Sequence, residues 1–263
     1  MKPGNDQNLL ITGKRLHVVE QPGWKERATE KMRLLLLLLL LLLLCFSVTL
    51  AQAGDDISTD RLVYRVLTQG EQAPQFNRIL VNRHHVRLDD GSGRDGFLLY
   101  DRKEKVIYSV NPEDRTTLEI APKPVKLEPV EGLKTEVKKK VHEKAPMIGG
   151  SRPVHVELLA NGQSCEKRIV VAGPMKRALE GLREYHRTLS YQQRASLGAI
   201  PADMQNDCDL ALHVYHSDLL LQEGMAIQRW GQGQHEELVD FAEGESMSRK
   251  LFELPKEFRR RAM

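Results

Sequence analysis

Internal repeats and long linkers are both missing from this sequence of 263 residues. Without self-similar segments at a fixed period, the chain cannot form a repeat architecture such as a solenoid. Without a long polar stretch between its patterned segments, it offers no boundary for a second folded domain. Cysteine is scarce as well, with three residues, so at most one disulfide bond can form within the chain.

A surplus of positive charge is also missing once the first 53 residues are set aside. Those residues hold seven of the 39 basic and four of the 36 acidic side chains, so 32 of each remain. A nucleic-acid-binding domain normally carries an excess of Lys and Arg on one surface, because phosphate contacts dominate its affinity. We therefore expect no nucleic-acid partner.

One long hydrophobic run stands out against this balanced background. Eleven consecutive leucines begin at Leu34, and the apolar stretch continues to Leu50, which makes 17 residues. A membrane-spanning helix needs about 20 residues, so the run is at the lower limit for a span. Lys31 and Arg33 precede it, as in the basic n-region of a secretory signal peptide.

The segment after the run predicts cleavage. Ala51 and Ala53 form a small-x-small pattern that a signal peptidase accepts, and the acidic sequence GDDISTD follows in place of a basic stop-transfer cluster. We predict a signal region over residues 1–53, with the signal peptide at 32–53, translation starting at Met32 and residues 1–31 untranslated. An uncleaved signal anchor is the alternative. The mature protein is then a single domain, 54–263, in the periplasm, with no permanent membrane span.

Cleavage would leave two cysteines, Cys165 and Cys208. In an oxidising compartment such a pair can form a disulfide, and closing a loop of this length would stabilise the fold by about 4 kcal/mol on the chain-entropy model. We predict this bond. The alternative is a pair of buried free thiols, because the sequence does not show their separation.

The first two thirds of the mature chain have the pattern of short antiparallel strands. RLVYRVL alternates, with Leu62, Tyr64 and Val66 on one face, and KVIYSV alternates in the same way. Asn161-Gly162 joins VHVELLA to CEKRIVV and is a strong hairpin signal. Near the end of the chain, MAIQRW and EELVDF flank GQGQ as another hairpin.

Two helical stripes follow the strands. Pro174 suits a first helical position, and apolar residues from Met175 to Leu189 recur at i, i+3, i+4 and i+7. The spacing from Met204 to Tyr215 predicts a second helix, which would turn Cys208 toward the strand of Cys165. We therefore expect an α+β domain in which a curved antiparallel sheet is covered on one face by two helices.

The segment HVRLDDGSGRDGFLLYDRKEKVIYSVNPEDRTTLEI, with Tyr100-Asp101 and Tyr108-Ser109-Val110 in its hairpin, resembles part of a group of uncharacterised exported bacterial proteins. These proteins are related to the LolA/LolB lipoprotein carriers. The ending LFELPKEF resembles the ending of the same group. The resemblance implies a LolA-like antiparallel half-barrel with helices across its concave side. For the carriers themselves it also implies that acyl chains are held there.

Motifs of enzymes have plainer explanations in this chain. Ser164 and Lys167 match S-x-x-K, but on a strand we expect them to face opposite sides. Gly231-Gln232-Gly233 lacks the third glycine and the helix of a dinucleotide loop.

The histidines do not complete a metal site either. His213 and His216 have the i, i+3 spacing of a chelating pair, with Asp218 as the nearest third ligand, but a metal site needs three or four converging ligands. His84 and His85 are adjacent on a predicted strand and would point to opposite faces. We expect no enzyme, no cofactor and no metal.

Four large apolar residues on predicted strands are candidates to line a concave ligand site: Tyr64, Phe97, Leu99 and Trp230. The alternative is that they belong to the core. Together with the resemblance, they lead to the hypothesis of a non-enzymatic, exported envelope protein that binds an apolar ligand, such as a lipid or a lipoprotein acyl chain. The alternative is an interaction module whose sheet binds another envelope protein.

Overall fold

The structure is a computed structural model that describes residues 32–39, 56–122, 132–201 and 204–263. The chain divides into two units, Met1–Gly54 and Asp55–Met263. In the first unit, residues 32–39 are helical, and the cleavage site predicted at Ala51 and Ala53 lies outside the described residues. Within the described part of the chain, no helix combines the length and the apolarity that a membrane crossing requires.

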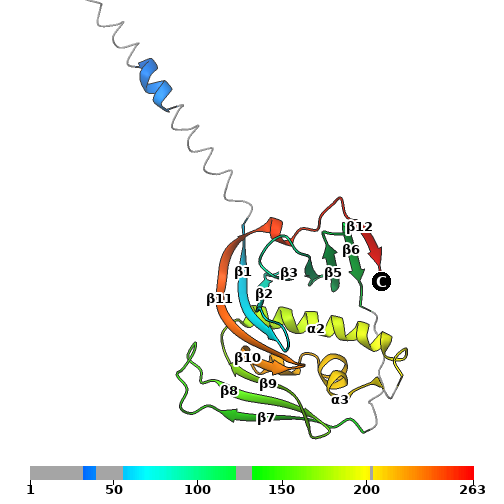
Figure 1. Cartoon of the computed structure of the whole chain (residues 1–263). Coiled ribbons are helices and arrows are strands. Elements are labelled where there is room, and N and C mark those ends of the chain that lie inside the picture. Colours follow the sequence, from blue (N-terminus) through cyan, green and yellow to red (C-terminus); the bar gives the residue numbers. More distant parts are fainter. Residues whose placement is uncertain (1–31, 40–55, 123–131, 202–203) are drawn as a thin grey trace, which may run out of the picture. The chain divides into compact units, whose positions relative to one another are not determined.

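Twelve strands of the second unit form one sheet, in the order β12-β6-β5-β4-β3-β2-β1-β11-β10-β9-β8-β7. The strands are β1 (Asp56–Thr68), β2 (Gln75–Val81), β3 (His85–Asp89), β4 (Phe97–Asp101), β5 (Val106–Asn111), β6 (Thr116–Ile120), β7 (Thr135–Val141), β8 (Val154–Ala160), β9 (Gln163–Val171), β10 (Met225–Gly231), β11 (Gln234–Ser248) and β12 (Arg259–Ala262). The sheet bends into an arch around the helices (Figure 1). β7 and β12 are its two edges in the described chain, so the arch is not closed.

Among the strands that the structure describes, neighbours pair antiparallel, with one exception. β12 pairs parallel to β6, with Arg259 opposite Thr116. The hairpin predicted between β8 and β9 is confirmed, and Asn161 and Gly162 both have positive φ, at 48° and 82°. That combination is the one a two-residue turn needs to match the twist of its strands.

The helical segments are α2 (Lys176–Leu197), α3 (Asp207–Asp209), the π-helix η2 (Leu210–Tyr215) and the 3-10 turns η3 (Leu219–Gln222) and η4 (Arg249–Phe252). α2 begins two residues after Pro174, because Met175 adopts a left-handed conformation with φ 61° and acts as the N-cap. The second predicted helix is present from residue 207 onward, as α3 continued by η2.

The main core lies between α2 and the inner, concave face of the sheet. α2 contributes Ala178, Leu182 and Tyr185, and the sheet contributes Leu62 and Tyr100, all buried. The packing is close: a Cβ added at Gly181 would lie 2.8 Å from Val81 and 2.9 Å from Val86. Glycine is therefore required where α2 crosses β2 and β3.

Two smaller cores complete the domain. One lies under η2 and η3, where Ala211, Leu212 and Leu220 pack on β8 and β9. The other lies on the outer face of the sheet, where Phe252 of η4 covers Leu80 and Leu99. The prediction of an α+β fold with a curved, mostly antiparallel sheet is confirmed, whereas β12 and its parallel pairing were not predicted.

Candidate functional site

A cavity of about 600 Å³ lies between α2 and the inner face of the sheet. Its size is within the range of small-molecule sites, about 300 to 1,000 Å³. Much of its wall is aliphatic, with side chains from β1 to β4, from α2 and from η3. These are Leu62, Ile79, Leu88, Leu98, Leu179, Leu182, Leu189 and Leu221.

The wall formed by β9, β10 and β11 is charged instead. Arg168, Arg229 and Glu236 line the cavity there. The Nε of Arg168 donates to Glu166, and Arg229 donates to Glu236. Arg229 also lies 4.0 Å from Glu166. The cavity is therefore amphipathic, with an aliphatic region and a region of paired charges.

His186 of α2 borders the cavity on the helix side. Its ring lies 5.3 Å from that of Tyr185, edge to face, and among the described residues its nitrogens have no hydrogen-bond partner. Burial lowers the pKa of His186 to about 3, and the charges of Arg168, Arg229 and His213 lower it further in the same direction. At neutral pH the site thus presents an uncharged imidazole.

Tyr64, the first predicted candidate, lines this cavity. It lies on β1, and its hydroxyl donates to the carbonyl oxygen of Ala226 on β10 at 2.9 Å. Burial raises the pKa of this hydroxyl, so it stays protonated and can serve as a donor. The bond ties the aliphatic side of the cavity to the charged side.

Phe97 and Leu99 lie on the other face of the sheet from Tyr64. Leu99 is buried under Phe252, and the ring of Phe97 lies 3.7 Å from the guanidinium carbon of Arg87. On β4 the side chains that face the cavity and α2 are Leu98 and Tyr100. Side chains alternate between the two faces of a strand. If the outer face of β4 is taken for the inner one, every candidate residue on that strand is therefore placed on the wrong side of the sheet.

Trp230 is also turned away from the cavity. Its neighbour Arg229 lines the cavity, so alternation directs Trp230 to the outer face. There its ring stacks on that of His235, with centroids 5.0 Å apart, and its partner across the strands is Lys167. The four predicted candidates therefore do not lie together, and Tyr64 is the member that reaches the cavity.

Among the polar residues of the cavity, Tyr64 and His213 were named from the sequence, whereas Arg168, Arg229, Glu236 and His186 were missed. Arg168, Arg229 and Glu236 lie on strands that were predicted, and His186 lies within the predicted helical stripe. The sequence did contain a signal for His186. It lies four residues after Leu182 and three before Leu189, and this spacing places it on the same helical face as these two leucines.

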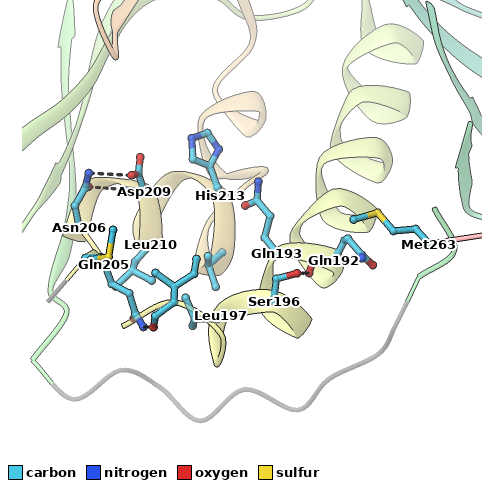
Figure 2. A pocket seen from close by; sticks show the side chains of 13 residues that line it. Gln192, Gln193, Ser196, Leu197, Gln205, Asn206, Asp209, Leu210, His213 and Met263 are labelled. Carbon is cyan, nitrogen blue, oxygen red and sulfur yellow. Dashed lines mark hydrogen bonds between the residues drawn. The ribbon is translucent and has the colours of Figure 1, made fainter. Parts of the chain in front are cut away.

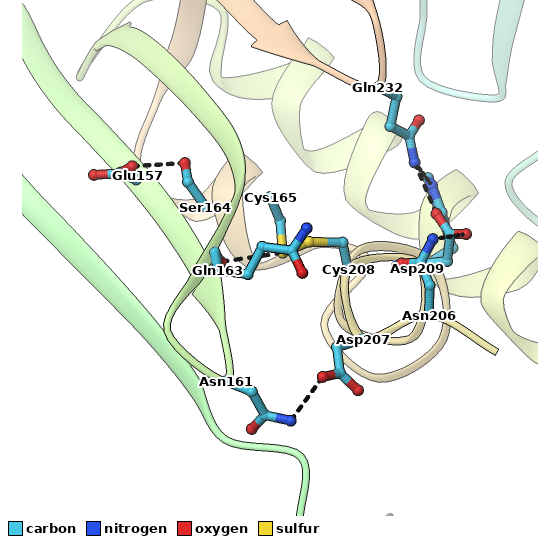
Figure 3. Close-up of a disulfide and its surroundings, with 11 residues drawn as sticks. Glu157, Asn161, Gln163, Ser164, Cys165, Asn206, Asp207, Cys208, Asp209 and Gln232 are labelled. Carbon is cyan, nitrogen blue, oxygen red and sulfur yellow. Dashed lines mark hydrogen bonds between the residues drawn. A yellow bond between two sulfur atoms is a disulfide. The ribbon is translucent and has the colours of Figure 1, made fainter. Parts of the chain in front are cut away.

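The predicted disulfide between Cys165 and Cys208 is present, with a Cα–Cα distance of 5.2 Å (Figure 3). It joins β9 to α3. Close by, the side-chain amide of Asn161, in the turn between β8 and β9, donates to Asp207 of α3 at 2.8 Å, so a second contact joins this hairpin to α3. The bond thus fixes the start of η2, which carries His213 into the cavity.

A second cavity, of about 420 Å³, lies between the last turns of α2 and η2 (Figure 2). His213 and Gln193 line both cavities. The Nε2 of His213 lies 2.7 Å from the Nε2 of Gln232, whose amide also contacts Asp209 at 3.1 Å. His213 is thereby held at the boundary between the two spaces.

The expectation that Ser164 and Lys167 face opposite sides is wrong. The register between β8 and β9 shifts after Leu158, and this bulge adds one residue to β9. Ser164 donates to Glu157 at 2.6 Å, and the Nζ of Lys167 lies 3.5 Å from the same carboxylate. Ser164 and Lys167 thus share the exposed outer face.

The two pairs of histidines named in the sequence analysis are His213 with His216 and His84 with His85, and the rings of each pair diverge. His213 contacts Gln232, whereas His216 lies 3.1 Å from the hydroxyl of Thr135 on β7. The rings of His84 and His85 are 6.3 Å apart, with His84 in the turn before β3. Over the described ranges, no group of three or more His, Cys, Asp or Glu side chains could hold a metal ion.

No family model matches the chain, and no curated protein matches it. Among solved structures it is similar to PNGF-II, with a TM-score of 0.38 and 6% identity over 78% of this chain and 32% of that one. It is also similar to an uncharacterized conserved protein from Thermus thermophilus, with a TM-score of 0.38 and 8% identity over 78% and 91% of the two chains. The chain spans about a third of the length of PNGF-II. At these values the similarity indicates neither a family nor a function.

Proposed function

We propose that this chain is an exported, non-enzymatic envelope protein with a LolA-like half-barrel, which shelters an apolar ligand such as a lipid or acyl chain. The observation that carries the proposal is the cavity of about 600 Å³ between α2 and the concave face of the sheet. A packed interior normally leaves few voids larger than a water molecule, so a space of this size with aliphatic side chains over much of its wall is suited to a ligand.

The rigidity of the surrounding frame supports this role. One wall is β1 to β4, which the main core ties to α2. The opposite wall is held by the bond between Tyr64 and Ala226, and the disulfide positions η2 at the end of the cavity. Because both walls are anchored independently of a ligand, the space is preformed, which lowers the entropic cost of binding.

The leucine run and the disulfide support export. A run that is basic at its start and followed by Ala51-Gln52-Ala53 is typical of a signal peptide. The Cys165–Cys208 bond is consistent with an oxidising compartment such as the periplasm.

A second candidate function is binding of an envelope protein along a sheet edge. It is favoured by β7, whose outer edge has no strand partner in the described chain. Lys138, Lys139 and Lys140 follow one another on this strand, and edge lysines commonly discourage the addition of another strand. Any partner there would be acidic, and we rank this function below ligand binding.

Uptake of 1-N-phenylnaphthylamine, a neutral apolar dye that fluoresces when it is buried, tests the leading proposal. Asn77 and Phe76 are adjacent on β2 and both exposed, but Asn77 lines the cavity and Phe76 faces away from it. Asn77→Trp should block the cavity and reduce dye binding about tenfold, whereas Phe76→Trp should bind as the wild type does. Absence of dye uptake by the wild type, together with no lipid mass in native mass spectrometry, would refute the proposal.

A further inference from the structure

We propose that the ligand of this cavity carries an anionic head group, a carboxylate or a phosphate, which Arg168 and Arg229 bind while its chain lies among the leucines. The inference rests on the proposed function and adds the chemical class of the ligand. The arrangement of charges on β9, β10 and β11 supports it.

The two arginines face each other across neighbouring strands. Arg229 is the register partner of Arg168 between β10 and β9. Like charges in directly opposite positions of a sheet repel each other, so the pair has a cost unless anions lie close to it. Glu166 and Glu236 supply one carboxylate for each guanidinium.

The guanidinium of Arg168 keeps unused donors. A guanidinium has five N–H groups, and Arg168 uses only its Nε–H, which donates to Glu166. No partner within the described residues accepts from its two terminal nitrogens, although the side chain is only 11% exposed. A guanidinium with four unused N–H groups beside a cavity is suited to a forked contact with a carboxylate or phosphate.

His186 lies within the electrostatic reach of both arginines. Burial lowers its pKa first, and Arg168, Arg229 and His213 lower it further, whereas Asp89 and Asp90, which also line the cavity, are not among the causes. The neutral imidazole could donate one N–H to an anion bound by the arginines.

Gln193 adds a further polar contact to the same region. It lines the cavity, and its side-chain oxygen is buried without a hydrogen-bond partner in the described part of the chain. This oxygen accepts hydrogen bonds, so it can pair with an O–H or N–H group of a ligand but not with an ionised oxygen. The donors for an ionised head are therefore those of the arginines, beside an aliphatic space for one chain.

Four C12 amphiphiles that differ only in the head group test the inference. Dodecanoate, dodecyl phosphate, 1-dodecanol and dodecyltrimethylammonium are titrated below their micelle concentrations by displacement of the neutral dye, and inorganic phosphate is added as a head without a chain. Dodecanoate or dodecyl phosphate should bind about ten- to a hundredfold more tightly than 1-dodecanol, and the cation should bind most weakly.

Two variants separate head recognition from folding. Arg168→Gln should bring the affinity for the anionic amphiphile down to that for 1-dodecanol, while the affinity for 1-dodecanol stays the same and reports an intact cavity. Arg65→Gln removes an arginine that forms an exposed ion pair with Glu237 on β1 and β11, and it should change neither affinity.

The outcomes distinguish the inference from the function on which it rests. Equal binding of all four amphiphiles would leave the proposed function standing and overturn the anionic head. Binding of inorganic phosphate, lost in Arg168→Gln, without binding of any chain would support the anion site and refute the apolar ligand. Unchanged dodecanoate binding in Arg168→Gln would overturn the inference.

Discussion

In the half of the sheet formed by β1 to β6, apolar side chains are buried on both faces, under α2 on the inside and under η4 on the outside. In β7 to β9 the inner face packs on η2 and η3, whereas the outer face carries Glu157 with its partners Ser164 and Lys167. One half is therefore stabilised mainly by burial. The other half adds a covalent bond to a smaller core, whereas ion pairs occur in both halves, such as Arg87–Asp89 in the first and Lys167–Glu157 in the second.

The difference follows from the helices that each half has available. α2 has 22 residues and presents a long apolar face, whereas η2 and η3 have six and four residues. Segments this short bury too little surface to be held by packing alone. The disulfide and the bond from Asn161 to Asp207 hold them in place, and the space left between the two halves is the cavity.

The largest effect is expected from Tyr100, which is 1% exposed in the main core. Tyr100→Ala should lower the free energy of unfolding by about 3 to 5 kcal/mol, because a large cavity would replace the ring. Tyr100→Phe is the control: it removes only the hydroxyl that accepts from Thr188 and should cost about 1 kcal/mol. Urea titration measures both losses. Similar losses for the two variants would mean that the hydroxyl, and not the packing of the ring, supplies most of the stabilisation by Tyr100.

A somewhat smaller loss is expected from the disulfide. The double variant Cys165→Ser with Cys208→Ser opens a link between residues separated by 43 positions. It should lower the free energy of unfolding by about 2 to 4 kcal/mol. Hydrogen exchange should show faster exchange in η2 and η3 than in α2. Equally faster exchange throughout the domain would mean that the disulfide stabilises both halves of the sheet, and not mainly the half that contains it.

The pH dependence of stability should report the protonation of His186, whose imidazole is half-buried beside the cavity. The pKa of His186 is about 3 in the folded protein, below its ordinary value of 6.5. The unfolded chain therefore binds more protons between these values, so stability is fully present above pH 6.5 and falls as the pH drops toward 3. His186→Gln should remove about 1 to 3 kcal/mol of this loss, seen as a shallower decrease of the melting temperature. An identical slope would show that His186 stays charged in the fold.

The smallest effect is expected from an exposed ion pair. Arg65→Gln breaks the contact with Glu237, where both side chains are more than a third exposed. The loss of stability should be below about 1 kcal/mol and should vanish in high salt. A loss as large as that of the disulfide variant would mean that one exposed ion pair stabilises the fold as much as the covalent bond does.

Local patterns predicted much of the architecture. Asn161-Gly162 predicted its hairpin, the stripe from Met175 to Leu189 predicted α2, and the two cysteines predicted their bond. The site was predicted less well. Tyr64 was placed correctly on the inner face of the sheet, but Phe97 and Trp230 lie on the outer face.

The reason lies in the period of a strand. A strand alternates its two faces, and its sequence shows that alternation without showing which face becomes concave. β4 has apolar residues on both faces, so Phe97 and Leu99 are equivalent to Leu98 and Tyr100 until α2 and η4 cover opposite sides. The bulge in β9 adds a further shift, which moved Ser164 to the side of Lys167.

By itself the sequence determined the elements that depend on near neighbours: the strands, the hairpin turn, the long helix and the even count of cysteines after residue 53. Tertiary structure alone decided that Arg168 and Arg229 lie opposite each other, that His186 enters the same space, and that β12 returns to pair with β6. Propensity and periodicity act over a few residues, whereas the cavity arises where segments far apart in the chain curve toward each other.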